Sequence, residues 1–155
     1  MFHVGERVCY PMHGVGVVEA IQEQEVLGET KAYYMLRFVL GKMTAMVPVQ
    51  SAKSVGLRPV INPEECERVR AYLLQDVQPE SDNWNQRYRE NLEKLRIGEI
   101  YGVADVVKSL IRRERDRGLS AGERKMFLTA KQVLLAELVA ASGKEEETFL
   151  AVMGE

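Results

Sequence analysis

The residues with the clearest capacity for chemistry lie between positions 83 and 89, where the chain runs Asn-Trp-Asn-Gln-Arg-Tyr-Arg. This segment contains the only tryptophan, Trp84, together with Tyr88 and the arginines Arg87 and Arg89. Such a set suits nucleic acid, because an apolar ring can enter a minor groove at an unstacked step while nearby arginines neutralise phosphates. The tryptophan falls in the first turn of an expected helix, where the helix dipole and free N–H groups also favour phosphate.

A second interpretation of Trp84 needs no nucleic acid. Trp84, Tyr88, Leu92 and Leu95 follow spacings of four, four and three, so they share one face of the expected helix. That face predicts packing of the tryptophan into a helical bundle. The residues alone leave both interpretations open.

A basic stretch follows further along the chain. Between residues 108 and 131 there are eight lysines and arginines against three acids, a net charge of +5, although the whole chain carries −2. The cluster at 112–117 and the pair Arg124 and Lys125 are candidates to extend a DNA-facing surface. A solvated helix end explains the cluster equally well, because cations favour helix C-termini.

The sequence contains no motif typical of an enzyme or a metal site. It lacks a phosphate-binding glycine loop, a His-Glu-x-x-His pair and a Gly-x-Ser-x-Gly elbow. His13 has no partner placed by sequence for acid–base chemistry, so we expect it in a turn. Cys9 and Cys66 form no Cys-x-x-Cys pair, so we expect small buried hydrophobic residues. We therefore predict a protein that is not an enzyme and has no catalytic residues, metal or cofactor.

The elements that must position these residues differ between the two parts of the chain. Up to about residue 60, apolar residues recur with period two or in short runs at 15–18, 32–38 and 44–48, separated by glycine-containing turns. This pattern predicts a small antiparallel barrel or curled sheet. An exposed strand edge of such a sheet can pair with an edge strand of another protein.

From residue 61 the period becomes helical. Asn62 followed by Pro63 predicts a helix start, and Val69, Leu73 and Leu74 form the apolar face of this first helix. A turn is expected at 77–80, after which Ser81 or Asp82 would cap the helix that contains Trp84.

Two long helices and a short one complete the predicted bundle. The third helix runs from about 99 to 117, with Gly118 as its C-terminal cap. Ser120 and Glu123 fit the capping box that opens the fourth helix. A short amphipathic piece at 145–152 closes the bundle. The sequence thus predicts an α+β protein with a β-domain at 1–60 and an all-α helical domain at 61–155.

The N-terminus alternates apolar and polar residues and lacks a long apolar run. It therefore resembles neither a signal peptide nor a membrane span. We expect a cytoplasmic protein with no membrane partner.

The opening residues resemble a known family. Residues 4–16, Val-Gly-Glu-Arg-Val-Cys-Tyr-Pro-Met-His-Gly-Val-Gly, are similar to the start of the RNA-polymerase-interacting domain of the CarD/CdnL family, also found in transcription-repair coupling factor. Further matches are Val47 with Pro48, 55–58, 83–95 and 118–126. Their order and spacing cover nearly the whole chain.

The resemblance implies a fold and a function. It implies a Tudor-like, SH3-like N-terminal barrel that binds the polymerase β subunit, and a helical domain that contacts promoter DNA at the upstream edge of the transcription bubble. Trp84 matches the family's wedge tryptophan, which sits in the minor groove and stabilises the open promoter complex. Arg87 and Arg89 fall at DNA-facing positions, and Asn83, Arg124 and Lys125 are expected to extend that surface.

Some positions depart from the family's pattern. Gln24 and Met46 occupy barrel positions that are basic in some members and contact polymerase. We therefore expect the polymerase contact, formed by Gln24, Met46, Val47 and Pro48, to rely on main-chain pairing and apolar contact.

Two other functions remain as alternatives, a stand-alone DNA-binding protein and a protein-only adaptor that uses the β-domain edge. The net negative charge disfavours stand-alone binding. Minor-groove contact distinguishes base pairs poorly, so sequence-specific recognition is not expected. A monomer is expected, although exposed strand edges permit exchange between copies.

Overall fold

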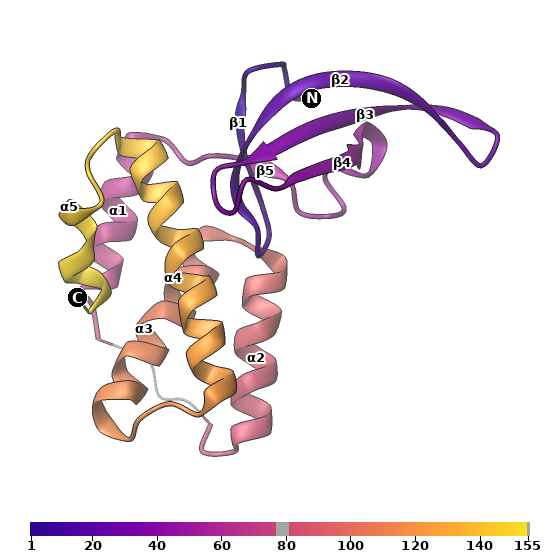
Figure 1. Ribbon diagram of the computed structural model, residues 1–155. Helices are drawn as coiled ribbons and strands as arrows, with labels where there is room; N and C mark the ends of the chain where they lie inside the picture. The colour runs from indigo at the N-terminus through magenta and orange to yellow at the C-terminus, as the bar shows by residue number, and fades with distance from the viewer. Residues whose placement is uncertain (77–80, 155) are drawn as a thin grey trace.

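The computed structural model describes residues 1–76 and 81–154 as a small sheet followed by a bundle of helices (Figure 1). The turn expected at 77–80 lies outside the described residues, as does Glu155. The sheet caps one end of the elongated bundle, and the opposite end of the bundle points away from it (Figure 1).

The N-terminal part forms the predicted antiparallel sheet. Its five strands have the order β4-β3-β2-β1-β5, so β4 and β5 are the two edges. The strands are β1 (Arg7–Tyr10), β2 (Gly14–Val26), β3 (Glu29–Phe38), β4 (Thr44–Pro48) and β5 (Arg58–Pro59), with the short 3-10 helix η1 (Val49–Ser51) after β4. The sheet encloses a core of its own, formed by Val8, Val18, Tyr34, Leu36, Phe38, Val47, Ala52 and Leu57.

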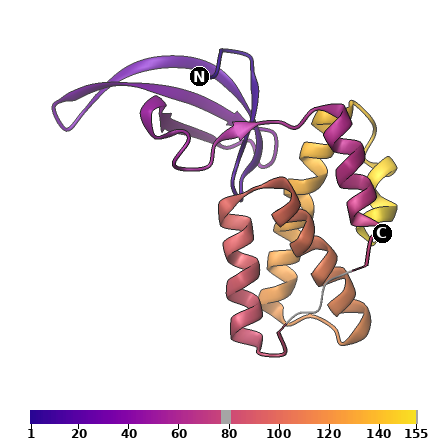
Figure 2. The ribbon, with the colours of Figure 1, turned by 180° about the vertical axis from the view of Figure 1, so that it is seen from behind.

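The β2–β3 hairpin is longer than the sequence pattern indicates. Its register runs from Gly16 opposite Phe38 to Val26 opposite Glu29, well beyond the residues that pair with β1 and β4. Leu27 and Gly28 form its two-residue turn with φ of 54° and 81°. The hairpin therefore projects from the sheet as a two-stranded ribbon (Figures 1 and 2).

The C-terminal part is helical, as predicted. The helices are α1 (Pro63–Leu73), α2 (Trp84–Ile97), α3 (Ile100–Asp116), α4 (Ala121–Ser142) and α5 (Glu147–Leu150), followed by η2 (Ala151–Met153). Phe149 and Met153 are completely buried, so the short C-terminal piece does close the bundle. The buried cysteines confirm a further expectation, since Cys9 and Cys66 are both free and buried.

The local helix signals are largely correct. Asn62 caps α1 by accepting the N–H of Glu65 at 2.7 Å, and Ser120 with Glu123 forms the complete capping box of α4. The cap of α2 is Asn83, one or two residues later than expected. Leu74, predicted on the apolar face of α1, is exposed because it forms the C-cap, after the last buried residue of the helix.

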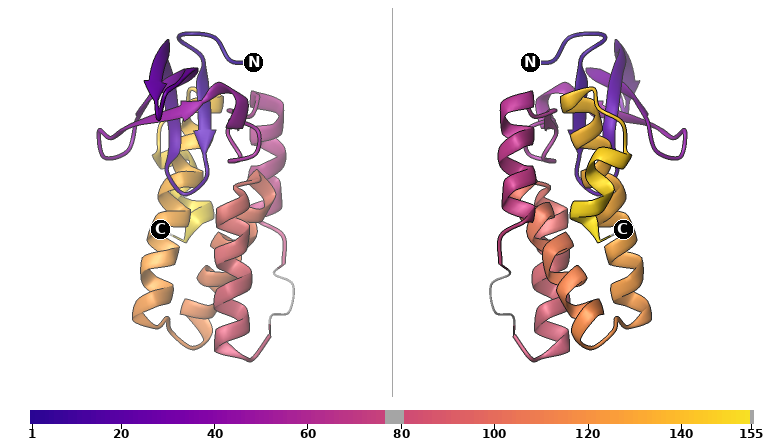
Figure 3. Two further views of the ribbon diagram at one scale, coloured as in Figure 1. Left: turned by 90° about the vertical axis from the view of Figure 1, so that its right-hand side faces the viewer. Right: turned by 90° about the vertical axis from the view of Figure 1, so that its left-hand side faces the viewer.

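A network of hydrogen bonds joins the sheet to the bundle. Arg58 of β5 binds both carboxylate oxygens of Glu137 of α4, at 2.6 and 2.8 Å, and also donates to the carbonyl of Gly98, the C-cap of α2. Glu137 accepts the N–H of Ile61 as well. Pro11 packs so tightly against Gly98 that a Cβ there would lie 2.8 Å from the proline Cγ. These contacts fix the direction in which the bundle leaves the sheet (Figure 3).

Candidate nucleic-acid and protein interfaces

The tryptophan lies at the end of the bundle farthest from the sheet. Trp84 is the first residue of α2, and the α3–α4 turn lies beside it (Figures 1 and 3). Its side chain is 42% exposed and stacks on Tyr88, with ring centroids 5.0 Å apart and an angle of 15° between the planes. An apolar surface made by two aromatic rings is thus partly open to solvent.

Hydrogen bonds hold the indole in place. Its Nε1 donates to Ser120 Oγ and to Glu123 Oε1, each at 3.3 Å. Gly122 lies against the two rings, since a Cβ there would be in ordinary van der Waals contact with them, 3.5 Å from Tyr88 and 3.9 Å from Trp84. The capping box of α4 therefore has a second role, which is to orient the tryptophan.

Arg87 corrects a sequence prediction. It was expected to face DNA, but it is 1% exposed and its Nε donates to Glu123 Oε2 at 3.3 Å, while Nη1 donates to the Ser81 carbonyl. Three positions after Trp84, the helix has turned this side chain toward α4 instead of solvent. Arg87 is therefore part of the support of Trp84 rather than of its exposed surface.

The environment of Glu123 favours its ionised form. Burial alone would raise the pKa of this carboxyl, but hydrogen bonds from the backbone and hydroxyl of Ser120 and from Arg87 lower it below the ordinary value of 4.5. The carboxylate thus stays charged at neutral pH while it accepts from both the indole and the guanidinium.

The predicted stripe on α2 is only partly buried. Leu95 is buried and Tyr88 is partly buried, while Trp84 and Leu92 are exposed. Arg87 and Asn91 complete the buried side of the helix. The tryptophan packs on Tyr88 yet keeps an open face.

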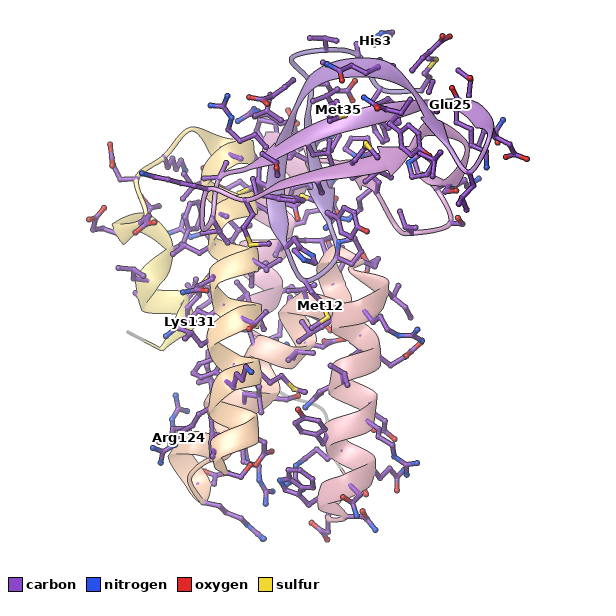
Figure 4. All side chains as sticks on the ribbon, turned by 45° about the vertical axis from the view of Figure 1, so that its right-hand side comes forward. His3, Met12, Glu25, Met35, Arg124 and Lys131 are labelled. Carbon is purple, nitrogen blue, oxygen red and sulfur yellow. The ribbon has the colours of Figure 1, made fainter. Side chains whose placement is uncertain are left out.

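The other predicted DNA-contacting residues are exposed on the first turns of α2 and α4. Arg89 is exposed, as are Arg124 and Lys125 in the first turns of α4 (Figure 4 labels Arg124). Within the basic stretch at the end of α3, Arg112, Arg115 and Arg117 are exposed. Asn83 is exposed too, but its side-chain oxygen is occupied by the N–H of Gln86 as the helix cap.

The predicted polymerase contact divides between exposed and buried residues. Met46 of the edge strand β4 is 44% exposed, and Gln24 lies on the projecting ribbon, paired with Lys31. Val47 is 3% exposed and belongs to the sheet core, which corrects its assignment as a contact residue, because alternate side chains of a strand point to opposite faces. Pro48, partly buried, ends β4.

In residues 1–76 and 81–154, no group of three or more potential ligands forms a candidate metal site. Over the same residues, no helix combines the length and apolarity needed to cross a bilayer.

Sequence reasoning missed two sets of residues. Ser120 and Glu123 were identified only as a helix cap, although they also bind Trp84. The Arg58–Glu137 pair was not predicted at all, since its members lie 79 positions apart and nothing local indicates their contact.

The antiparallel sheet has an open edge and is hydrogen-bonded to a bundle that presents a supported tryptophan at its far end. Residues 2–61 match the CarD-like/TRCF RID domain, and residues 68–153 match the CarD C-terminal domain. These matches define the class of protein, a non-enzymatic transcription factor with a polymerase-interacting domain. The chain is also 37% identical over 150 residues to the "Putative transcription factor YdeB" of Bacillus subtilis (strain 168), covering 95% of this chain and 96% of that protein. The chain belongs to the CarD family.

Proposed function

We propose that this protein binds the β subunit of RNA polymerase through its N-terminal sheet and stabilises the open promoter complex with Trp84. In this proposal the indole enters the minor groove at the upstream edge of the bubble and hinders its closure. The protein would act in the cytoplasm, where polymerase and promoter DNA meet.

The proposal rests on the exposure and the hydrogen bonding of Trp84. A large aromatic side chain, 42% exposed, is held by two hydrogen-bond acceptors at the far end of the bundle. Fixing the ring before binding lowers the ordering cost of an insertion. The exposed cations Arg89, Arg124 and Lys125 supply charge for the flanking phosphates.

Polymerase tethering explains how so small a basic surface suffices. The chain carries a net charge of −2, so its few cations give weak affinity for free DNA at physiological salt. A weak contact becomes effective when a second contact raises its local concentration. The open edge of β4, with Met46 exposed, is the candidate for that second contact.

The test is the lifetime of the open complex on a promoter with cognate polymerase. We expect Trp84→Ala to bind polymerase normally and to shorten the lifetime by at least about fivefold, since stacking on a base contributes about 1–3 kcal/mol. Met46→Asp should instead weaken polymerase binding, while Met43→Asp, at an exposed methionine before β4, serves as its control.

Each alternative function has its own outcome in this test. If Trp84→Ala matches the intact protein, the wedge assignment is wrong. If the intact protein does not bind polymerase but binds promoter DNA alone, it is a stand-alone DNA-binding protein. If it binds polymerase and leaves the open complex unchanged, the adaptor function replaces the proposal.

A further inference from the structure

Helix α4 has two apolar faces, one buried inside the bundle and one only partly covered by it. Met126, Ala130, Leu134 and Leu138 are buried against the other helices. A second stripe is formed by Leu128, Leu135 and Val139, whose spacings of seven and four place them on one side of the helix. Leu128 is 53% exposed, so this stripe reaches solvent.

The second stripe forms the floor of a groove at the junction of the two parts of the molecule. Val39 and Leu40, in the loop after β3, line the groove from the sheet, and Leu150 lines it from α5. The hollow has a volume of about 650 Å³. A second hollow of about 360 Å³ shares Leu128 and Lys131 with it and extends past Phe127 toward Leu119. From Leu128 to Val139 the floor is roughly 16 Å long, about three turns of a helix.

The charged residues that line the two hollows carry a net charge of +1. Lys131, Arg124 and Arg7 contribute three cations, against the carboxylates of Glu114 and Glu146. Lys131 Nζ lies 4.9 Å from the centre of the Phe127 ring, and Arg7 Nη1 donates to the Ala140 carbonyl at 2.7 Å. Figure 4 shows Lys131 above Arg124 on the same side of α4.

We propose that this groove, lined by Leu128, Leu135, Val139, Val39, Leu40 and Leu150, binds an acidic amphipathic helix of another protein. Apolar residues of that helix at i, i+4 and i+7 would cover the stripe of α4, and carboxylates beside them would face Lys131 and Arg124. The apolar part of the groove is separate from both the β4 edge and Trp84, and Arg124 is shared with the proposed DNA-facing surface. It gives the protein a third contact, which goes beyond polymerase and DNA binding.

The probe for this groove is a synthetic helical peptide of about 18 residues with leucines at i, i+4, i+7 and i+11 and glutamates beside them. Two matched peptides are needed, one with the same residues in scrambled order and one with lysine in place of glutamate. Binding of the labelled peptides to the full chain is measured by fluorescence anisotropy, and the site is located by amide chemical shifts.

Two variants test the groove itself. We expect Leu128→Asp and Lys131→Glu each to weaken binding of the acidic peptide at least about fivefold. Leu27→Asp places the same charge at an exposed leucine on the hairpin and should have no effect. Thermal unfolding of each variant checks that the fold is intact. If Leu128→Asp does not fold, Lys131→Glu still tests the groove.

Three results would overturn the proposal. The scrambled or lysine peptide binds as tightly as the acidic one; both groove variants bind like the intact protein; or sedimentation shows a dimer that Leu128→Asp dissociates, which would mean that a second copy covers the groove. Binding of the acidic peptide alone, with shifts confined to α4, the β3–β4 loop and α5, supports it.

Discussion

Glu123 connects two side chains of different kinds, the buried Arg87 and the half-exposed Trp84. Removing the carboxylate would leave the guanidinium buried without its ionic partner, which is more costly than losing a surface pair. We predict that Glu123→Ala lowers the free energy of unfolding by about 3–5 kcal/mol, as measured by urea denaturation.

Arg124→Ala is the matched control for Glu123→Ala. It removes a charge at the next, exposed position and should change stability by less than about 0.5 kcal/mol. If both variants lose a similar amount of unfolding free energy, the Arg87–Glu123 pair contributes no more to stability than an exposed charge does.

The lowered pKa of Glu123 predicts an acid-dependent change at the tryptophan. Because this pKa is lower in the folded than in the unfolded chain, the carboxylate contributes stability above about pH 4.5, and this contribution is lost as the pH falls through the folded-state pKa. Protonation also weakens the acceptor of the indole N–H. We therefore expect Trp84 fluorescence to change below pH 4.5 before global unfolding, and we expect Glu123→Gln to lack this early change.

At the scale of the element, the N-terminal cap of α2 determines where Trp84 sits. Asn83 accepts the N–H of Gln86 at 3.0 Å, and Asn62 makes the equivalent bond at the start of α1. We predict that Asn83→Ala and Asn62→Ala each cost about 1 kcal/mol in urea denaturation. Only Asn83→Ala should shorten the open-complex lifetime, because only α2 positions the tryptophan. Equal lifetimes for the two variants would contradict a positioning role for the cap.

The elements that sequence predicts best are those specified by neighbouring residues. Asn62 with Pro63 identifies the start of α1, and Ser120 with Glu123 identifies the start of α4, because each cap involves residues three positions apart. The projecting length of the β2–β3 ribbon could not be predicted, since its polar, alternating residues resemble an ordinary surface loop.

The candidate site was predicted only in part, because some of its contacts join neighbouring residues and others join residues far apart in the sequence. The position of Trp84 in a first turn follows from its neighbours, and the structure agrees. The burial of Arg87 depends on Glu123, 36 residues later, and on the rotation of α2 against α4. No local pattern contains that information, so residue type and the family resemblance together suggested a DNA contact for this arginine.

At the scale of the whole molecule, Arg58 links the sheet to two helices of the bundle. Lysine keeps the charge but cannot bind both oxygens of Glu137 and the Gly98 carbonyl together. We predict that Arg58→Lys lowers the free energy of unfolding by about 1.5–3 kcal/mol. It should also shorten the open-complex lifetime with Trp84 unchanged.

Residual dipolar couplings measure this effect directly. In the intact protein, amides of the sheet and of the bundle should fit one alignment tensor, and in Arg58→Lys they should require two. Arg112→Lys, at an exposed position on α3, is the control. A single tensor and an unchanged lifetime for Arg58→Lys would show that the junction is rigid without this arginine.

The bond between Arg58 and Gly98 gives α2 the geometry of a lever. The fulcrum is the C-cap at Gly98, and Trp84 is at the other end of the 14-residue helix, roughly 21 Å away. A tilt of about 10° at the fulcrum would move the indole by roughly 3.6 Å, close to the ~3.4 Å rise of one base in a DNA strand. If Trp84 inserts into promoter DNA as proposed, the angular stiffness of the junction determines, to within one base step, where on the promoter the ring arrives.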